Sequence, residues 1–257
     1  MTAARAELAV TGALMRRAIN EVVRVPGAAI PAILAPSIFM LGLTAVFGNL
    51  SQLPGFSTDD YMTFLIPVSL MQSGAFTGAA TGVNLARDIE LGWFDCMLVS
   101  PASRRSLLAG LVLSASFRSL MPMALLIVVG LSLDVPFPGL GDLLVSIAIA
   151  AAFAAVAASW GVSLALRFKT QSAAPLMQAG MFMAVLFTTS YAPQELLTGW
   201  LAEVARINPV THVLEAVRQG FTGQVTWAET WPGLVALAGL GLVLVGFALR
   251  ALRRATA

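Results

Sequence analysis

Six long apolar runs, each bounded by charged residues or turn formers, constrain this chain more than any other feature. They cover residues 28–47, 62–85, 107–133, 143–166, 173–191 and 234–249. A helix crosses a bilayer with about 20 mostly apolar residues, and its backbone hydrogen bonds are all satisfied internally. Hydrophobic residues make up 58% of the chain and charged residues 11%, which excludes an ordinary soluble domain. We therefore predict an all-α, polytopic membrane protein with six transmembrane helices in one domain, residues 1–257.

The basic residues are distributed unevenly between the two sides of this six-span arrangement. Twelve Lys and Arg residues fall on one side, only Arg206 and Arg218 fall on the other, and Arg118 falls inside the third run. Loops rich in Lys and Arg stay on the cytoplasmic side of a membrane. We expect both termini to be cytoplasmic.

Two segments outside the runs have helical periodicity of their own. Residues 7–25 place apolar residues on one face and arginines on the other, which is typical of an interfacial helix lying among lipid headgroups; a simple basic topology anchor is the alternative. Residues 192–232 contain two apolar-periodic pieces separated by Asn208-Pro209, and we expect two short helices that cap the bundle or re-enter the outer leaflet.

A short charged stretch interrupts the apolar pattern between the second and third runs. We expect a cytoplasmic helix over residues 86–100, followed by a break at Pro101. Leu91, Phe94 and Leu98 would form its apolar face, and its charged and turn residues are Arg87, Asp88, Glu90, Gly92 and Asp95. The stretch is too acidic to favour contact with anionic lipid, so docking to a cytoplasmic protein is the preferred interpretation over lying on the inner leaflet.

The residue inventory argues against an enzyme. His212 is the one histidine and Cys96 the one cysteine, so the sequence offers no metal-binding cluster and no disulfide. Lys169, the one lysine, follows no glycine-rich phosphate loop, and no basic patch with interleaved aromatics suggests nucleic acid. If ATP powers the protein, another subunit must bind it.

Polar and aromatic residues within the runs are candidates for a substrate path. Arg118 in the third run must face protein, water or a headgroup, because an isolated arginine in the bilayer is costly; alternatively the helix starts below the membrane or the side chain snorkels. The remaining candidates are Gln72, Phe76, Asn84, Gln178 and Phe182. Hydrogen bonding and packing between helices are the simpler use of such side chains. No acidic residue lies deep in a run, which weakens the case for an ion-coupled carrier.

Two motifs resemble the ABC-2 type permeases, in particular the daunorubicin-resistance type of drug and lipid exporter. The first is RDIELGWFDCMLVSPASRRSLLAG at Arg87 to Gly110, where Gly92, Ser100, Pro101 and Arg104 match the family pattern. The second is INPVTHVLEAVRQGFTG at Ile207 to Gly223, where Asn208 and Pro209 match and Arg218 matches loosely. The resemblance covers essentially the whole chain.

The resemblance implies a half-transporter in the plasma membrane of a bacterium. Two permease chains, identical or different, would pair within membrane lipid, and a separate cytoplasmic ATPase would bind ATP and Mg. Residues 7–25 would be an elbow helix, residues 86–100 the helix that couples to the ATPase, and residues 192–232 an outer cap. The expected cargo is an amphipathic drug or a lipid. A polysaccharide permease of the same family, a membrane scaffold or sensor, and an intramembrane hydrolase using His212 are the alternatives.

Overall fold

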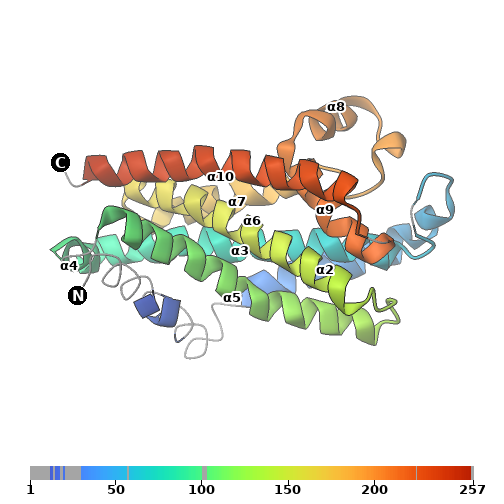
Figure 1. Ribbon diagram of the computed structural model, residues 1–257, viewed down its shortest axis with the longest axis horizontal. Coiled ribbons are helices and arrows are strands. Elements are labelled where there is room, and N and C mark those ends of the chain that lie inside the picture. The colour runs from blue at the N-terminus through green and yellow to red at the C-terminus, as the bar shows by residue number, and fades with distance from the viewer. Residues whose placement is uncertain are drawn as a thin grey trace.

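The chain forms an elongated bundle of helices in the computed structural model (Figure 1), which describes residues 12–13, 15–17, 20, 30–56, 58–99, 103–223 and 225–255. Its elements in chain order are α2 (Ile30–Phe47), η2 (Gly48–Gln52), α3 (Tyr61–Glu90), α4 (Trp93–Val99), α5 (Arg104–Ser132), α6 (Leu140–Phe168), η3 (Gln171–Ala173), α7 (Ala174–Leu186), η4 (Gln194–Leu196), α8 (Gly199–Ile207), α9 (Pro209–Thr222) and α10 (Trp227–Ala255). The expected all-α fold is confirmed for this part of the chain. The described residues 12–13, 15–17 and 20 are helical, and the rest of the expected elbow helix lies outside the described residues.

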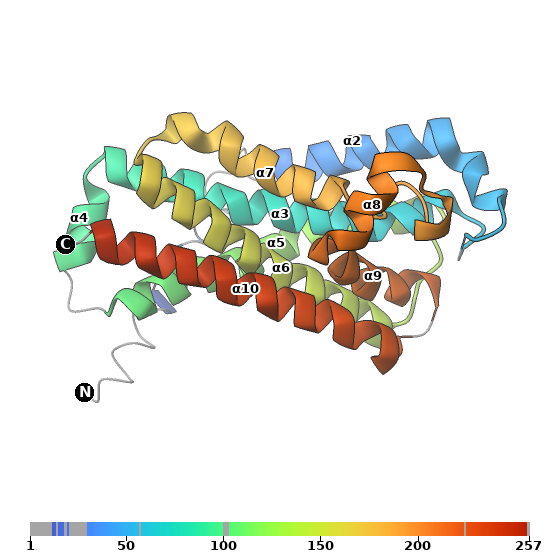
Figure 2. The same ribbon diagram turned by 90° about the horizontal axis from the view of Figure 1, so that it is seen from above.

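Helix α3 is the centre of the bundle, and α2, α5, α6, α7 and α9 all pack against it (Figure 2). The Asp60 carboxylate starts α3 by accepting hydrogen bonds from the Met62 and Thr63 amides at 3.2 and 2.9 Å, as an N-cap residue does. Glycines allow α3 and α6 to touch at their backbones. A Cβ placed on Gly82 would lie 2.3 Å from the Gly161 carbonyl carbon. Close backbone approach at small residues is characteristic of helix pairs in membranes.

Four of the described helices are long and apolar enough to cross a membrane. They are the segment Ala32–Gln52, which comprises most of α2 together with η2, and the helices α5, α6 and α10. Helix α3 has 30 residues but carries the polar strip that contains Gln72 and Ser73, and it falls outside this set.

The fifth apolar run is shorter as a helix than the sequence suggests. Helix α7 has 13 residues, or about 20 Å, although the run predicted a helix to residue 191. The hydroxyls of Thr188 and Ser190 both donate to the Val185 carbonyl, at 2.6 and 2.7 Å. Serine and threonine side chains compete with the helical ladder in this way, so the chain leaves the helix at Leu186.

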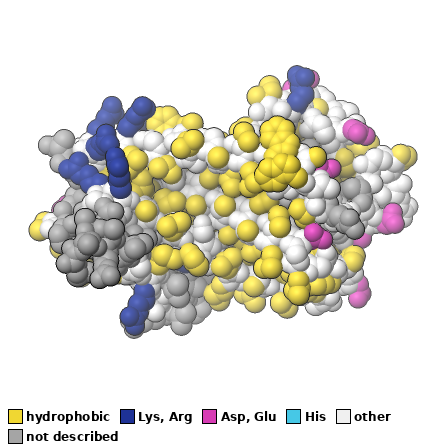
Figure 3. All heavy atoms as spheres, viewed as in Figure 1, with side chains coloured by type: hydrophobic (Ala, Val, Ile, Leu, Met, Phe, Trp, Pro, Cys, Tyr) yellow, Lys and Arg dark blue, Asp and Glu magenta, His cyan; other side chains and the backbone are white. Residues whose placement is uncertain are grey.

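Charge divides the bundle into two ends. Lys and Arg side chains gather at the end that holds α4 and the C-terminus, and Asp and Glu side chains gather at the end that holds α8, with hydrophobic side chains between them (Figure 3). Among the exposed hydrophobic residues of this belt are Ile38, Val128, Leu144, Leu242 and Val243. Water-soluble monomers rarely expose a contiguous apolar surface of this extent, so the belt is consistent with a surface that faces lipid.

Candidate functional site

The charged stretch at the basic end forms two helical pieces rather than the single helix expected over residues 86–100. Helix α3 continues to Glu90, so Arg87, Asp88 and Glu90 belong to its last turn. Gly92 then adopts a left-handed conformation, φ +74°, which glycine accepts without steric cost. The chain turns there and starts the seven-residue helix α4.

This turn changes which apolar side chains are exposed. Phe94, expected on the docking face, is 7% exposed and belongs to the core of the bundle. Leu91, Trp93 and Val99 are 61%, 62% and 87% exposed. The predicted apolar face of Leu91, Phe94 and Leu98 is therefore wrong at Phe94. The prediction assumed one continuous helix, whereas the chain turns at Gly92. The side chain of Leu98, together with Pro101, lies outside the described residues.

Two of the acidic side chains hold the basic end together. Asp88 accepts hydrogen bonds from Arg17 at 2.9 Å, and Arg17 also contacts the Met97 sulfur at 4.0 Å. One arginine of the N-terminal segment thus reaches both α3 and α4. Sequence reasoning assigned Arg17 no such role, because its partner Asp88 is 71 residues away and leaves no local signal.

Glu90 attaches the end of α3 to the connection between α6 and α7. Its carboxylate accepts hydrogen bonds from the Thr170 hydroxyl at 2.7 Å, the Gln171 amide at 3.0 Å and the Gln171 side chain at 2.9 Å. These bonds, first that from Thr170, lower the pKa of Glu90 below its usual value. Arg87 and Asp95 remain exposed, so they are the charged candidates open to a partner.

The expected substrate-path residues do not form one surface. Phe76 of α3 stacks on Phe182 of α7, with ring centroids 5.7 Å apart. Arg118 is buried and donates to Thr81, which lies five residues beyond Phe76 and so about 140° around α3. Arg118 lies midway along α5 and its side chain faces α3 instead of extending to the end of the helix, which argues against snorkelling. The other interpretation, in which the third helix begins below the membrane, stays a prediction.

Two amides of the expected path are buried without partners. The Gln72 side chain is 1% exposed, and neither its oxygen nor its nitrogen has a hydrogen-bond partner in the described part of the chain. The Gln178 oxygen is in the same state, whereas Asn84 is half-buried. Unpaired buried amides are rare because they cost free energy, so Gln72 and Gln178 remain candidates for a ligand or a second chain.

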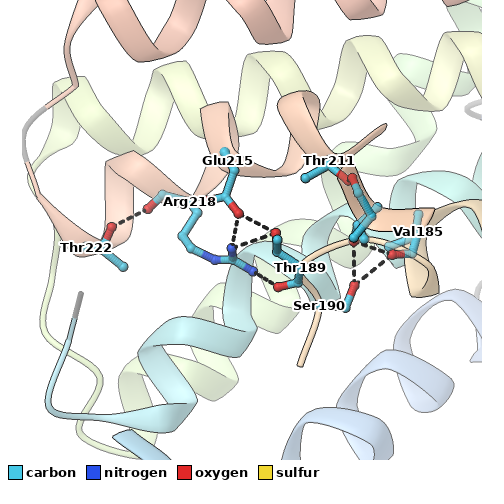
Figure 4. Close-up of polar contacts among 9 residues, drawn as sticks. Val185, Thr189, Ser190, Thr211, Glu215, Arg218 and Thr222 are labelled. Atoms are coloured by element: carbon cyan, nitrogen blue, oxygen red, sulfur yellow. Dashed lines mark hydrogen bonds and ion pairs between the residues drawn. The ribbon is translucent and has the colours of Figure 1, made fainter. Parts of the chain in front are cut away.

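At the acidic end, Arg218 of α9 is the most enclosed charge in the described chain (Figure 4). It is 3% exposed. It pairs with Glu215 and donates to the Thr189 hydroxyl at 3.2 Å and the Thr189 carbonyl at 2.7 Å. Its guanidinium carbon lies 3.9 Å from the centre of the Phe64 ring, which adds a cation–π contact.

The pair Asn208-Pro209 lies at the start of α9 and connects α7, α8 and α9. The Asn208 side-chain oxygen caps α9 by accepting from the Val210 amide at 3.0 Å. Its nitrogen donates to the carbonyls of Ala184 and Phe187 at 2.8 and 2.9 Å, at the end of α7. Pro209 occupies the first turn of α9, where it needs no amide hydrogen. The two short helices expected in residues 192–232, with the break between them, are therefore present as α8 and α9. Their role as an outer cap stays a prediction.

Sequence reasoning missed Thr189 and Glu215 as partners of Arg218. Glu215 precedes Arg218 by three residues, a spacing at which side chains on a helix meet, so this pair carried a local signal. Thr189 lies 29 residues away, and only the fold brings it to the guanidinium.

Residues 9–222 match the ABC-2 type transporter family. The chain belongs to this family. Its predicted resemblance is thereby confirmed, and this ABC-2 chain is a multi-pass membrane protein. Among the described residues, no group of three or more His, Cys, Asp or Glu side chains is placed to hold a metal ion.

Two relatives show the branch of the family that this ABC-2 chain resembles. It is 28% identical over 239 residues to the daunorubicin resistance ABC transporter permease protein DrrB1 of Streptomyces coeruleorubidus, covering 89% of this chain and 80% of the relative. It is 26% identical over 239 residues to a protein of Mycobacterium tuberculosis named "Probable doxorubicin resistance ABC transporter permease protein DrrC", covering 91% and 83%.

Proposed function

We propose that this chain is the permease subunit of an ATP-binding-cassette exporter that moves an amphipathic drug or a lipid across the plasma membrane of a bacterium. The family match carries this proposal. The names of the two relatives refer to drug resistance, one to daunorubicin and the other to doxorubicin. A separate ATPase binds ATP and Mg, and a second permease chain completes the transporter.

All six apolar runs act as membrane spans in this proposal. Helix α3 is long enough to cross, and its polar strip is shielded because α2, α5, α6, α7 and α9 surround it. Helix α7 is shorter than the bilayer core of about 30 Å, and the buried segment Thr188–Ser190 extends its path toward the acidic end. The basic end is cytoplasmic, because Lys and Arg concentrate there.

The ATPase docks on the cytoplasmic end, against α4 and the last turn of α3. Leu91, Trp93 and Val99 supply exposed apolar contacts, and Arg87 and Asp95 supply exposed charges. Exposed tryptophans are common anchors of protein interfaces. The buried Phe94 and the Glu90 contacts join this surface rigidly to α3 and to the α6–α7 connection, so movement of the ATPase would be transmitted to the spans.

The test is ATP-driven transport in inverted membrane vesicles that contain this chain and its ATPase. Daunorubicin accumulation is followed by quenching of its fluorescence, and a fluorescent phospholipid analogue is measured in parallel. We expect ATP-dependent accumulation of at least one probe, lost when either chain is omitted. Equal accumulation without this chain would contradict the proposal, and an assembled ATPase complex that moves neither probe would favour another cargo such as a polysaccharide.

A further inference from the structure

A groove with a volume of about 660 Å³ lies between the basic ends of α6 and α10. Its apolar lining comes from Trp160, Leu164, Leu244, Phe247 and Ala251. The substrate candidates Gln72, Phe76, Arg118, Gln178 and Phe182 are not among its lining residues, and neither is any residue of α4.

Four cationic side chains surround one end of this groove. They are Arg167 on α6, Lys169 directly after the end of α6, and Arg250 and Arg254 on α10. All four are exposed. No Asp or Glu is among the described lining residues, and none of the four cations forms an ion pair within the described part of the chain. Such a cluster of like charges repels itself unless an anion neutralises it.

The charged and apolar parts of the groove follow one another along the axes of α6 and α10. Trp160 precedes Arg167 by seven residues, and Phe247 precedes Arg254 by seven, which is about 10 Å along a helix in each case. The cations therefore lie toward the basic end, and most of the apolar lining runs from them toward the middle of the bundle. Ala251 lies between Arg250 and Arg254. A phospholipid has the same order, with its phosphate at the interface and its acyl chains in the hydrocarbon.

We propose that this groove is a binding site for a resident phospholipid with an anionic headgroup. The phosphate would contact the four cations, and one acyl chain would lie along Leu164, Leu244 and Phe247. Basic pockets between transmembrane helices bind anionic headgroups in this way. The lipid would bridge α6 and α10. This proposal depends on the chain's place in a membrane and not on the cargo of the transporter.

The test measures lipid retention by native mass spectrometry on the full chain, purified in a neutral detergent. Dioleoyl phosphatidylglycerol and dioleoyl phosphatidylcholine are added at equal concentration. We expect preferential binding of phosphatidylglycerol, weakened about tenfold in the double variant Arg250→Gln, Arg254→Gln, since each cation near a membrane surface adds to anionic lipid affinity. The matched control is Arg104→Gln, Arg105→Gln, an exposed basic pair at the same end but outside the groove, which should keep wild-type binding.

A second variant separates the groove from general surface charge. Ala251→Phe fills the apolar lining and leaves all four cations, and we expect it to reduce retention of both lipids. Glycerol phosphate, which has the headgroup charge but no acyl chain, should not displace the lipid. Equal binding of the two lipids by wild type, equal weakening in the control pair, or displacement by glycerol phosphate would overturn the proposal.

Discussion

Arg218 donates hydrogen bonds to two oxygens of Thr189, the hydroxyl at 3.2 Å and the carbonyl at 2.7 Å. This contact ties α9 to the segment that follows α7, and Glu215 and Phe64 complete the surroundings of the guanidinium. Arg218 therefore attaches α9 both to α3 and to the segment after α7. Tyr61 supports the same region by donating to the Tyr191 carbonyl at 2.8 Å.

Replacing Arg218 with lysine should destabilise the protein, because an ammonium cannot reproduce the planar, multiply bonded guanidinium. We expect a loss of about 1.5–3 kcal/mol, the range for hydrogen bonds to a charged group. Thermal unfolding in detergent measures the effect. The control is Arg206→Lys, since Arg206 pairs with Glu203 at the same three-residue spacing but is exposed, and surface pairs contribute little. Equal effects of the two substitutions would contradict the structural role of Arg218.

Replacing Gly82 with valine should prevent α3 and α6 from packing. A Cβ at Gly82 meets the Gly161 backbone at 2.3 Å, and backbone atoms cannot move aside as a flexible side chain can. We expect a loss of about 3 kcal/mol or more, at the upper end for overpacking, and a low yield of monodisperse protein on size-exclusion chromatography. Gly42→Val on α2, where a Cβ meets nothing within 4 Å, should leave the yield unchanged.

The Glu90 contacts should make part of the stability depend on pH. Because folding lowers the pKa of Glu90, the unfolded chain binds the proton more tightly than the folded chain. The stabilisation is therefore complete above the unfolded pKa near 4.5 and is lost as pH falls through the lower folded value.

The measurement for Glu90 is the difference in melting temperature between wild type and Glu90→Gln from pH 7 to pH 3. We expect a constant difference above about pH 5 that shrinks as the pH falls further. Asp95→Asn on the exposed side of α4 should produce no such change. A difference that grows toward low pH would contradict the assignment.

Cys96 tests the orientation without any substitution, because it is the one cysteine and is exposed on α4. A maleimide that cannot cross membranes should leave it unlabelled in intact cells and label it once the membrane is opened. Glu203→Cys in a Cys96→Ser background places the thiol on α8 at the opposite end, and it should show the reverse pattern. Labelling of Cys96 in intact cells would contradict a cytoplasmic basic end.

The apolar runs predicted the all-helical fold correctly, because hydrophobic length acts locally along the chain. The count of six spans and the orientation stay predictions. The same rules failed where the backbone changed direction. The turn at Gly92 directs the Phe94 side chain into the core. The hydroxyls of Thr188 and Ser190 bind the Val185 carbonyl, and α7 ends earlier than predicted. The polar partners could not be predicted either, because Arg17 with Asp88 and Arg218 with Thr189 meet only after the bundle has formed.

The most direct test of the coupling proposal is purification of the tagged full chain from its native membranes, with measurement of the ATPase that accompanies it. We expect wild type to carry the ATPase, and the variant Leu91→Ala, Trp93→Ala to lose it by about tenfold or more, as truncation of an interface anchor does. Leu242→Ala, Val243→Ala, an exposed apolar pair on α10, should keep it. Absence of an ATPase from the intact wild-type protein, or full retention by the α4 variant, would contradict coupling through α4.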